Sequence, residues 1–251
     1  MKLFFTLLVF VLLTTFSVFA QKQTDRDVNR LSGDVKKVVQ ETAKIVFENE
    51  TVIESERFPN SIVTYDIEGN LLKSDVFYKG ILYIRTIFGY FDEERISREI
   101  KFPENENFPP FAVQLANEDS KQAKKYTHKF EYDDNGRRIE EKIFLNGDVL
   151  FLHNTINYND KGNQTEWNRY SADGKLNMKC VFDENGDATK VIFPTHMKAY
   201  EDSIFIFDEY NFDSQGNWIK RTIKKLITEN GQLKFAPFQV EYRKITYFIQ
   251  K

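Results

Sequence analysis

The sequence predicts an all-β protein, an elongated and twisted antiparallel meander of repeated β-hairpins that forms a single layer or a curled half-barrel. Three observations predict this fold. A short corner motif recurs along the chain, glycine turns of a second kind lie between its copies, and the residues after each corner alternate in character.

The corner motif is an aromatic residue followed by Asp or Asn, two further residues and Gly. The Asp or Asn side chain accepts hydrogen bonds from nearby backbone N–H groups, which opens a tight turn. The Gly takes the positive-φ position that closes the turn without steric cost. Five copies occur, at Tyr65–Gly69, Tyr132–Gly136, Tyr158–Gly162, Phe182–Gly186 and Phe212–Gly216.

The second kind of turn ends in Gly as well, and Asn-Gly and Asp-Gly pairs are strong signals for a β-hairpin. These turns stand at Lys79-Gly80, Asn146-Gly147, Asp173-Gly174 and Asn230-Gly231. Each repeating unit therefore contains two strands and two turns. We interpret Phe91–Arg95 as a decayed corner in which Arg95 replaces the glycine, so a different turn is expected there.

The residues after each corner glycine alternate as a strand does, because successive side chains point to opposite faces of a sheet. The third residue is predicted to face inward: Leu72, Ile139, Thr165, Thr189 and Ile219. The fourth is charged in every copy and is predicted to face outward: Lys73, Glu140, Glu166, Lys190 and Lys220. The seventh returns to the inner face: Val76, Ile143, Arg169, Phe193 and Ile223.

Residues 1–20 have the pattern of a secretory signal peptide. Lys2 precedes the apolar run Leu3–Leu13, and Ser17–Ala20 offers a cleavage site after Ala20. The alternative is an uncleaved membrane anchor, but the apolar run is short and polar residues follow it at once. The pattern predicts export to the periplasm or the extracellular space, and no membrane span after cleavage.

The rest of the chain is expected to fold as one domain. Residues 21–30 are polar and are predicted to be a flexible N-terminal segment, and residues 31–251 form a single β-repeat domain. Two stretches break the strand pattern, near residues 103–125 and 194–202, and are expected to be insertions. The segment Gln239–Tyr247 alternates and is predicted to be the closing strand.

Composition excludes several functional classes. The formal net charge is −3, and removing Lys2 makes the chain slightly more acidic, which argues against nucleic acid as a partner. Cys180 is the single cysteine and alternates with apolar residues, so it is predicted to be a buried structural thiol without an intrachain disulfide. The three histidines have no metal-ligand spacing, and no motif for a cofactor or a catalytic nucleophile is present.

The candidate binding residues are an aromatic and a neighbouring cation. Trp218 is predicted to lie on the polar face with Lys220, where an indole beside an ammonium group can stack on a sugar ring or anchor a partner protein. The alternative is that Trp218 covers its turn and packs on its neighbours. Trp167 falls on the inward phase and is predicted to belong to the core.

The corners resemble the YD-repeat (RHS-like) family, and the framing resembles secreted proteins of Bacteroidota. The resemblance rests on Tyr65–Asn70, Tyr132–Arg137, Tyr158–Asn163 and Phe212–Asn217, and on the Leu31–Lys36, Gly216–Trp218 and Arg243–Tyr247 segments. It implies a β-sheet scaffold of a kind sometimes described as sugar-binding, and it specifies no chemistry. The small number of repeats departs from the large encapsulating members.

Two functional hypotheses follow. The first is a non-catalytic exported binding or scaffold protein of the cell envelope, with a glycan or an envelope protein as partner. The second is a carbohydrate-active enzyme that uses paired carboxylates in a groove of the sheet, about 5–10 Å apart. The sequence names neither the ligand nor the oligomeric state.

Overall fold

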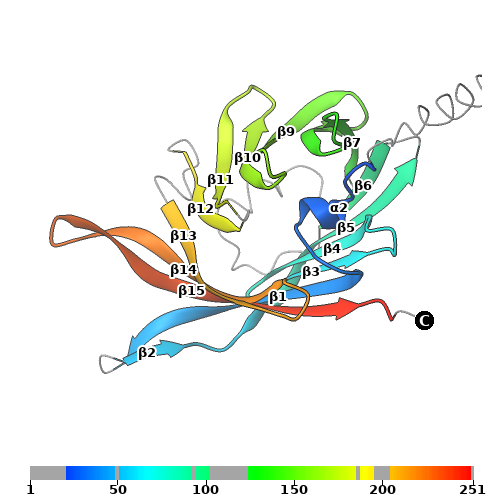
Figure 1. Ribbon diagram of the computed structural model, residues 1–251. Helices are drawn as coiled ribbons and strands as arrows, with labels where there is room; N and C mark the ends of the chain where they lie inside the picture. Colours follow the sequence, from blue (N-terminus) through cyan, green and yellow to red (C-terminus); the bar gives the residue numbers. More distant parts are fainter. Residues whose placement is uncertain are drawn as a thin grey trace, which may run out of the picture.

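The computed structural model describes residues 21–48, 51–91, 94–101, 124–184, 187–194 and 204–249. One helical turn, α2 (Asp25–Val28), precedes a chain of strands (Figure 1). The strands of the first half are β1 (Val35–Glu48), β2 (Thr51–Glu54), β3 (Phe58–Tyr65), β4 (Leu71–Tyr78), β5 (Ile81–Phe91), β6 (Glu94–Lys101) and β7 (Lys124–Tyr132). Those of the second half are β8 (Arg138–Leu145), β9 (Val149–Tyr158), β10 (Gln164–Ser171), β11 (Leu176–Phe182), β12 (Ala188–Ile192), β13 (Ile204–Phe212), β14 (Trp218–Glu229) and β15 (Gln232–Tyr247).

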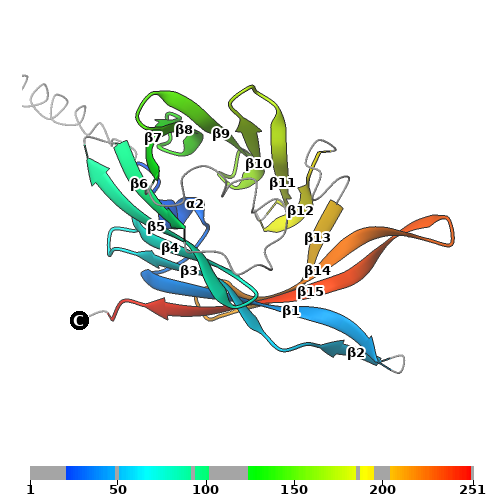
Figure 2. The ribbon, with the colours of Figure 1, turned by 180° about the vertical axis from the view of Figure 1, so that it is seen from behind.

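The strands close into a barrel, so the predicted open meander is wrong in its topology although the all-β class is right. β3 pairs antiparallel with β1, and from β4 to β15 each strand pairs with its predecessor. β15 then pairs antiparallel with β1, from Val35↔Tyr247 to Lys44↔Gln239. β2 pairs only with the far end of β1, so fourteen of the fifteen described strands form the ring. Figures 1 and 2 show the ring from opposite sides, with the β14–β15 hairpin extending beyond it.

Closure of the barrel has a physical reason that the alternation of residues along each strand does not reveal. In an open sheet β1 and β15 would both be edge strands, and each is long, with 14 and 16 residues. Unpaired edges of that length expose a row of backbone donors and acceptors. Pairing the two strands with each other satisfies these groups and removes both edges.

The corners form where the sequence predicts them. In all five, the Asp or Asn of the corner accepts a hydrogen bond through its side-chain oxygen from the backbone N–H four residues on. These bonds are Asn70 to Asp66 (2.7 Å), Arg137 to Asp133 (2.9 Å), Asn163 to Asn159 (2.9 Å), Asp187 to Asp183 (2.8 Å) and Asn217 to Asp213 (2.9 Å). The four corner glycines within the described residues have φ between 71° and 94°.

Each corner is followed by a β-bulge, and this corrects the predicted facing of the residues after it. Glu131 pairs with Glu140 but Tyr132 pairs with Arg138, so Ile139 is skipped, and the other four corners skip the equivalent residue. The extra residue shifts the alternation by one position. The second residue after each glycine therefore faces the interior, while the fourth faces out and the seventh faces in, as predicted. The interior-facing second residues are Leu71, Arg138, Gln164, Ala188 and Trp218.

The decayed corner is not a corner at all. Phe91 pairs with Glu94 and Tyr90 pairs with Arg95, so Arg95 lies inside β6 rather than at a turn position. Its side chain is buried in the barrel. Residues 92–93, which join β5 to β6, lie outside the described residues, as do most of the two predicted insertions; Lys124 and Lys125 already belong to β7.

Residues 22–34, here called the N-terminal strap, differ from the flexible segment that we expected for residues 21–30. Thr24 caps α2 through a capping box with Asp27, and the strap crosses the end of the barrel where the corners lie (Figure 1). It is attached at every corner. The five attachments are Gln23 N–H to the Gly136 carbonyl (2.8 Å), Arg26 N–H to the Gly69 carbonyl (3.0 Å), Gln164 Nε2 to the Val28 carbonyl (3.2 Å), the Arg30–Asp187 ion pair (3.6 Å) and Ser32 N–H to Asn217 Oδ1 (2.7 Å).

The buried apolar core is small and lies beside the strap. Leu31, Val35, Val38 and Tyr65 form its centre, and Ile245 is among the residues that pack against it. Most of the remaining buried side chains of the described residues are polar or charged. The strap and the closing strands thus seal one end with an apolar cluster, and the interior beside it is polar.

Candidate ligand cavity

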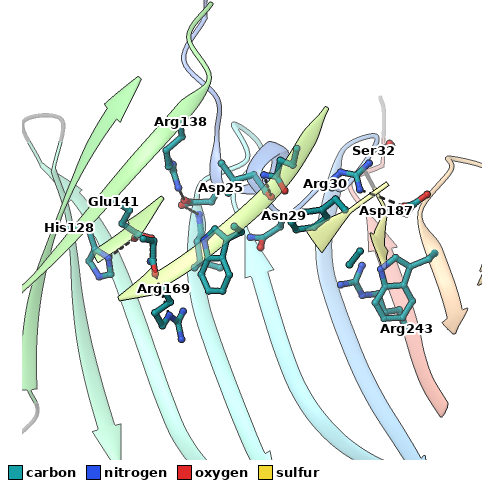
Figure 3. A pocket seen from close by; sticks show the side chains of 18 of the residues that line it. Asp25, Asn29, Arg30, Ser32, His128, Arg138, Glu141, Arg169, Asp187 and Arg243 are labelled. Carbon is teal, nitrogen blue, oxygen red and sulfur yellow. Dashed lines mark hydrogen bonds and ion pairs between the residues drawn. The ribbon is translucent and has the colours of Figure 1, made fainter. Parts of the chain in front are cut away.

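A cavity of about 550 Å³ lies inside the barrel against the strap, and nine charged residues are among those that line it. Figure 3 shows the strap residues Asp25, Asn29, Arg30 and Ser32 along one side of it. All five interior-facing residues that follow the corner glycines line it. The repeat therefore shapes the cavity, because each bulge turns the second residue after a corner glycine toward the interior.

Asp25 is the centre of the charge network. Its carboxylate accepts hydrogen bonds from Arg95 Nη1 and Arg138 Nη1, both at 2.8 Å, and from the Tyr90 hydroxyl. Only 2% of the residue is exposed. Burial alone would raise the pKa of Asp25, but the two guanidinium groups and the hydroxyl together lower it below 3.8. The strap thus places an ionised carboxylate between two arginines of the barrel wall.

A second carboxylate, Glu141, extends this network. It receives a hydrogen bond from Arg95, lies 2.9 Å from His128 Nδ1, and accepts another from Asn154 Nδ2 at 2.9 Å. Burial opposes ionisation of Glu141, but Arg95 and His128 lower its pKa far below the usual range. Burial also lowers the pKa of His128, which keeps its imidazole neutral.

Ser97 completes a hydrogen-bond chain that has the connectivity of a catalytic triad. Ser97 Oγ is 2.9 Å from His128 Nε2, and Glu141 contacts the other ring nitrogen. A nucleophile must reach its substrate, yet Ser97 is 2% exposed and is not among the residues that line the cavity. The chain therefore satisfies buried polar groups and positions His128, and no nucleophilic role follows from it.

Asp25 and Glu141 do not form the pair of carboxyl groups that the enzyme hypothesis requires. A glycosidase needs one carboxyl group that stays protonated, with a raised pKa, to act as the general acid. Asp25 and Glu141 share Arg95, and both have lowered pKa values. Neither can hold a proton near neutral pH.

The arginines of the lining fall into two groups. Arg95 and Arg138 contact Asp25, and Arg30 lies 3.6 Å from Asp187. Arg221 forms a close pair with Glu241, with its Nε donating at 2.7 Å. Within the described part of the chain, Arg169 and Arg243 have no carboxylate at ion-pair distance; Arg169 donates only to Asn154 Oδ1, at 3.3 Å. Two guanidinium groups in the cavity are therefore left without an anion.

Both of these guanidinium groups lie over indole rings. Arg243 lies 3.6 Å from the centre of the Trp218 ring, and Arg169 lies 4.8 Å from that of Trp167. Arg221 also contacts Trp218, at 4.2 Å. Stacking of this kind holds a planar guanidinium in place and leaves its N–H edge available.

The structure separates the two binding residues that the sequence predicts to lie together. Trp218 is only 9% exposed and lines the cavity, whereas Lys220 lies on the opposite face of β14 and contacts Glu54 at 3.1 Å. The bulge at Ile219 causes this difference. Trp167 faces inward as predicted but borders the cavity rather than an apolar core. Cys180 is free and largely enclosed, and burial raises the pKa of its thiol to about 11.

Sequence reasoning missed Asp25, Arg95, Arg138, Glu141 and Arg243. Arg138 was assigned no role because the bulge was not anticipated, and Arg95 was assigned to a turn. One signal was available: Arg138, Gln164 and Trp218 occupy the same position after three corner glycines. Large polar or aromatic residues at equivalent positions of a repeat indicate a shared functional face.

Two searches of the described residues gave negative results. No group of three or more His, Cys, Asp and Glu side chains among them is arranged to hold a metal ion. None of the helices in the described part of the chain has the length and hydropathy needed to cross a bilayer.

Comparison with known proteins identifies no family. No family model matches this chain, and neither does any curated protein. Among solved structures the chain is similar to a porin-like protein from Bacteroides uniformis ATCC 8492, with 10% sequence identity and a TM-score of 0.41 over 86% of this chain and 99% of that one. A likeness of this degree carries no conclusion about function.

The resemblance to the YD-repeat (RHS-like) family is therefore wrong as an assignment. The corners occur as that resemblance implies, but β15 returns to β1 and closes a barrel. No YD-repeat family model matches the chain either. This chain uses an aromatic–Asp–Gly corner to build a closed wall around a charged interior.

Proposed function

We propose that this chain is a non-catalytic protein of the cell envelope that binds a small molecule inside its barrel. The observation that carries this proposal is the cavity of about 550 Å³ beneath the strap. Its volume is within the range of roughly 300–1,000 Å³ typical of ligand pockets. Its lining combines two tryptophans with fixed polar groups, as such pockets usually do.

The strap supports a binding role because it closes one end of the barrel. It is attached at all five corners, and Asp25 fixes it to Arg95 and Arg138. In this proposal a ligand enters from the opposite end, where the turns at Lys79-Gly80, Asn146-Gly147 and Asp173-Gly174 lie. The strap then forms the floor of the pocket.

The outer face of the barrel supports an aqueous setting within the envelope. Ion pairs connect neighbouring strands on that face, among them Lys129–Glu94 (3.0 Å) and Lys224–Asp208 (2.7 Å). Exposed apolar residues such as Ile87 stand among them. A charged residue that faces lipid at the bilayer midplane costs about 2–4 kcal/mol, so a wall with charges on most strands is suited to water.

Export is the second part of the proposal. The predicted signal peptide, residues 1–20, lies outside the described residues, and its features in the sequence support cleavage after Ala20. The mature chain would then begin beside the strap and fold in the periplasm or outside the cell. Mass spectrometry of the protein purified from a Gram-negative host tests this, with Gln21 expected as the first residue.

Filling the cavity tests the binding role. Ala188 faces the interior, so Ala188→Phe is expected to occupy part of the cavity and reduce ligand binding at least tenfold. Ile87→Phe is the control, because Ile87 is 47% exposed and lies opposite Lys73 and Arg98 on the outer face of β5. Small molecules released by denaturing the purified protein are identified by mass spectrometry, and a metabolite and glycan panel is screened by calorimetry. Absence of any bound molecule in both assays, or equal binding by the Ala188→Phe variant, would contradict the proposal.

A further inference from the structure

We propose that the ligand of this cavity is anionic and carries carboxylate or phosphate groups, for which Arg169 and Arg243 are two separate binding positions. This inference rests on the proposed ligand-binding function and specifies its chemistry. The two residues come from β10 and β15, and Figure 3 shows them well apart, Arg169 near Glu141 and Arg243 on the side of Asp187.

The first support is the charge balance of the cavity. Six arginines line it, and four carboxylates contact four of them: Asp25, Glu141, Asp187 and Glu241. Arg169 and Arg243 are left over, so the described lining has an excess of positive charge. A buried charge without a partner is costly, and proteins usually compensate it with a bound counter-charge.

The nearby carboxylates cannot supply this counter-charge, because each is already engaged. Glu141 influences Arg169 electrostatically, but its oxygens are bonded to Arg95, His128 and Asn154. Glu241 is near Arg243 but binds Arg221 and accepts from Gln40 Nε2 at 3.0 Å. The other four arginines of the lining each contact a carboxylate, and these two do not.

The second support is the way the two groups are held. Stacking on Trp218 and Trp167 fixes the plane of each guanidinium. The Nε atom of Arg243 is buried and has no hydrogen-bond partner among the described residues. A fixed guanidinium edge with open donors matches the geometry of carboxylate and phosphate oxygens, which bind it through two parallel hydrogen bonds.

The electrostatic surroundings agree with this assignment. Burial, and then the nearby Arg221, lower the pKa of Arg243 to about 9. Burial lowers the pKa of Arg169 as well. A bound anion would stabilise the charged form of both groups. Without it the protein is less stable, a cost that functional sites commonly carry.

The test uses tryptophan emission, because Trp167 and Trp218 are the only two tryptophans and both stack on the arginines in question. The purified mature protein is titrated with cyclohexanecarboxylate, with inorganic phosphate, and with the neutral cyclohexanecarboxamide, and calorimetry measures each affinity. We expect at least one anion to change the emission and to bind at least tenfold more tightly than the amide. The two anions distinguish a carboxylate site from a phosphate site.

The variants are Arg169→Gln and Arg243→Gln, with Arg98→Gln as the control. At least one of the two interior substitutions is expected to weaken anion binding roughly tenfold or more, as loss of a charge-assisted hydrogen bond does. Arg98 is exposed on the outer face of β6, so Arg98→Gln is expected to bind as the wild type does. The interior variants are expected to melt at or above the wild-type temperature, because they remove unpaired buried charges. If Arg243→Gln does not fold, Arg243→Lys is used in its place. Lysine keeps the positive charge but lacks the two parallel N–H donors of a guanidinium, so it is expected to weaken anion binding less than Gln would.

Two outcomes would overturn the inference and leave the proposed function standing: equal affinity for the amide and the anions, or wild-type anion binding in both interior variants. A different outcome separates the two proposals. If no probe binds and no small molecule is released from the purified protein, the proposed function fails together with this inference.

Discussion

Replacing Asp25 with Asn is expected to lower the free energy of unfolding by about 3–5 kcal/mol. Asp25 is buried between Arg95 and Arg138, and its removal leaves Arg138 without a carboxylate. Breaking a buried ion pair by removing one partner typically costs that amount, because the other charge stays buried. For a chain of this size the melting temperature would fall by roughly 10 °C. Calorimetry at neutral pH measures the melting temperatures of the wild type and the variant.

The same substitution has a defined pH dependence. The pKa of Asp25 is lowered from 3.8 in the folded protein, so its stabilising effect is fully present above about pH 4. It is lost as the pH falls through the folded pKa, where wild-type Asp25 takes up a proton and resembles Asn. The difference in unfolding free energy between wild type and Asp25→Asn is therefore expected to be constant from about pH 7 to pH 5 and to shrink below about pH 4.

Asp34→Asn is the control for this prediction. Asp34 is also in the strap, but its side chain is 39% exposed and lies 3.6 Å from Arg26. Such partly solvated pairs contribute about 0–1 kcal/mol. Equal destabilisation by the two substitutions would show that the strap is held by something other than the buried Asp25 network.

Replacing Gly69 with Ala is expected to cost about 2–3 kcal/mol, and the strap is the reason. Gly69 has φ of +94°, which strains any residue with a Cβ by roughly 1–2 kcal/mol. An added Cβ would also lie 2.7 Å from Thr24 Oγ1, so the cap of α2 must move. Loss of an N-cap contributes about 1 kcal/mol more. Urea unfolding of the variant measures the sum.

Gly216→Ala separates strain from strap displacement. Gly216 has φ of +83° at an equivalent corner, but an added Cβ there meets no atom within 4 Å. Its expected cost is therefore the strain alone, about 1–2 kcal/mol. Trypsin cleavage within the strap, after Lys22 or Arg26, is expected to be faster in Gly69→Ala than in Gly216→Ala. If both variants lost the same stability and were cleaved alike, the contact between Thr24 and Gly69 would have no role.

The local part of the fold follows from the sequence, because it depends on short-range chemistry. The corners are fixed by an Asp or Asn side chain bonding the backbone four residues on and by a glycine at positive φ. The outward charges at Lys73, Glu140 and Glu166 were likewise predicted correctly. The bulge is not predicted, because the residues around each corner do not show which one of them, such as Ile139, is left without a partner on the neighbouring strand.

Barrel closure could not be predicted, because it depends on the accumulated twist and curvature of many strands. The pairing of Val39 with Lys244 joins residues more than 200 positions apart, and no local pattern encodes it. The cavity and its charged residues could not be predicted for the same reason. Arg95 and Arg138 can be buried only because Asp25, far away in the sequence, is brought between them.

Disulfide crosslinking between β1 and β15 tests the closed barrel most directly. In a Cys180→Ala background, Val39→Cys and Lys244→Cys place two thiols on directly opposed residues, within the Cα separation that a disulfide requires. The pair Lys220→Cys and Tyr242→Cys, on the adjacent strands β14 and β15, is the positive control because it can form in an open or a closed sheet. We expect both pairs to crosslink within a monomer on mild oxidation. Crosslinking of the control pair alone would contradict a closed barrel and the enclosed cavity with it.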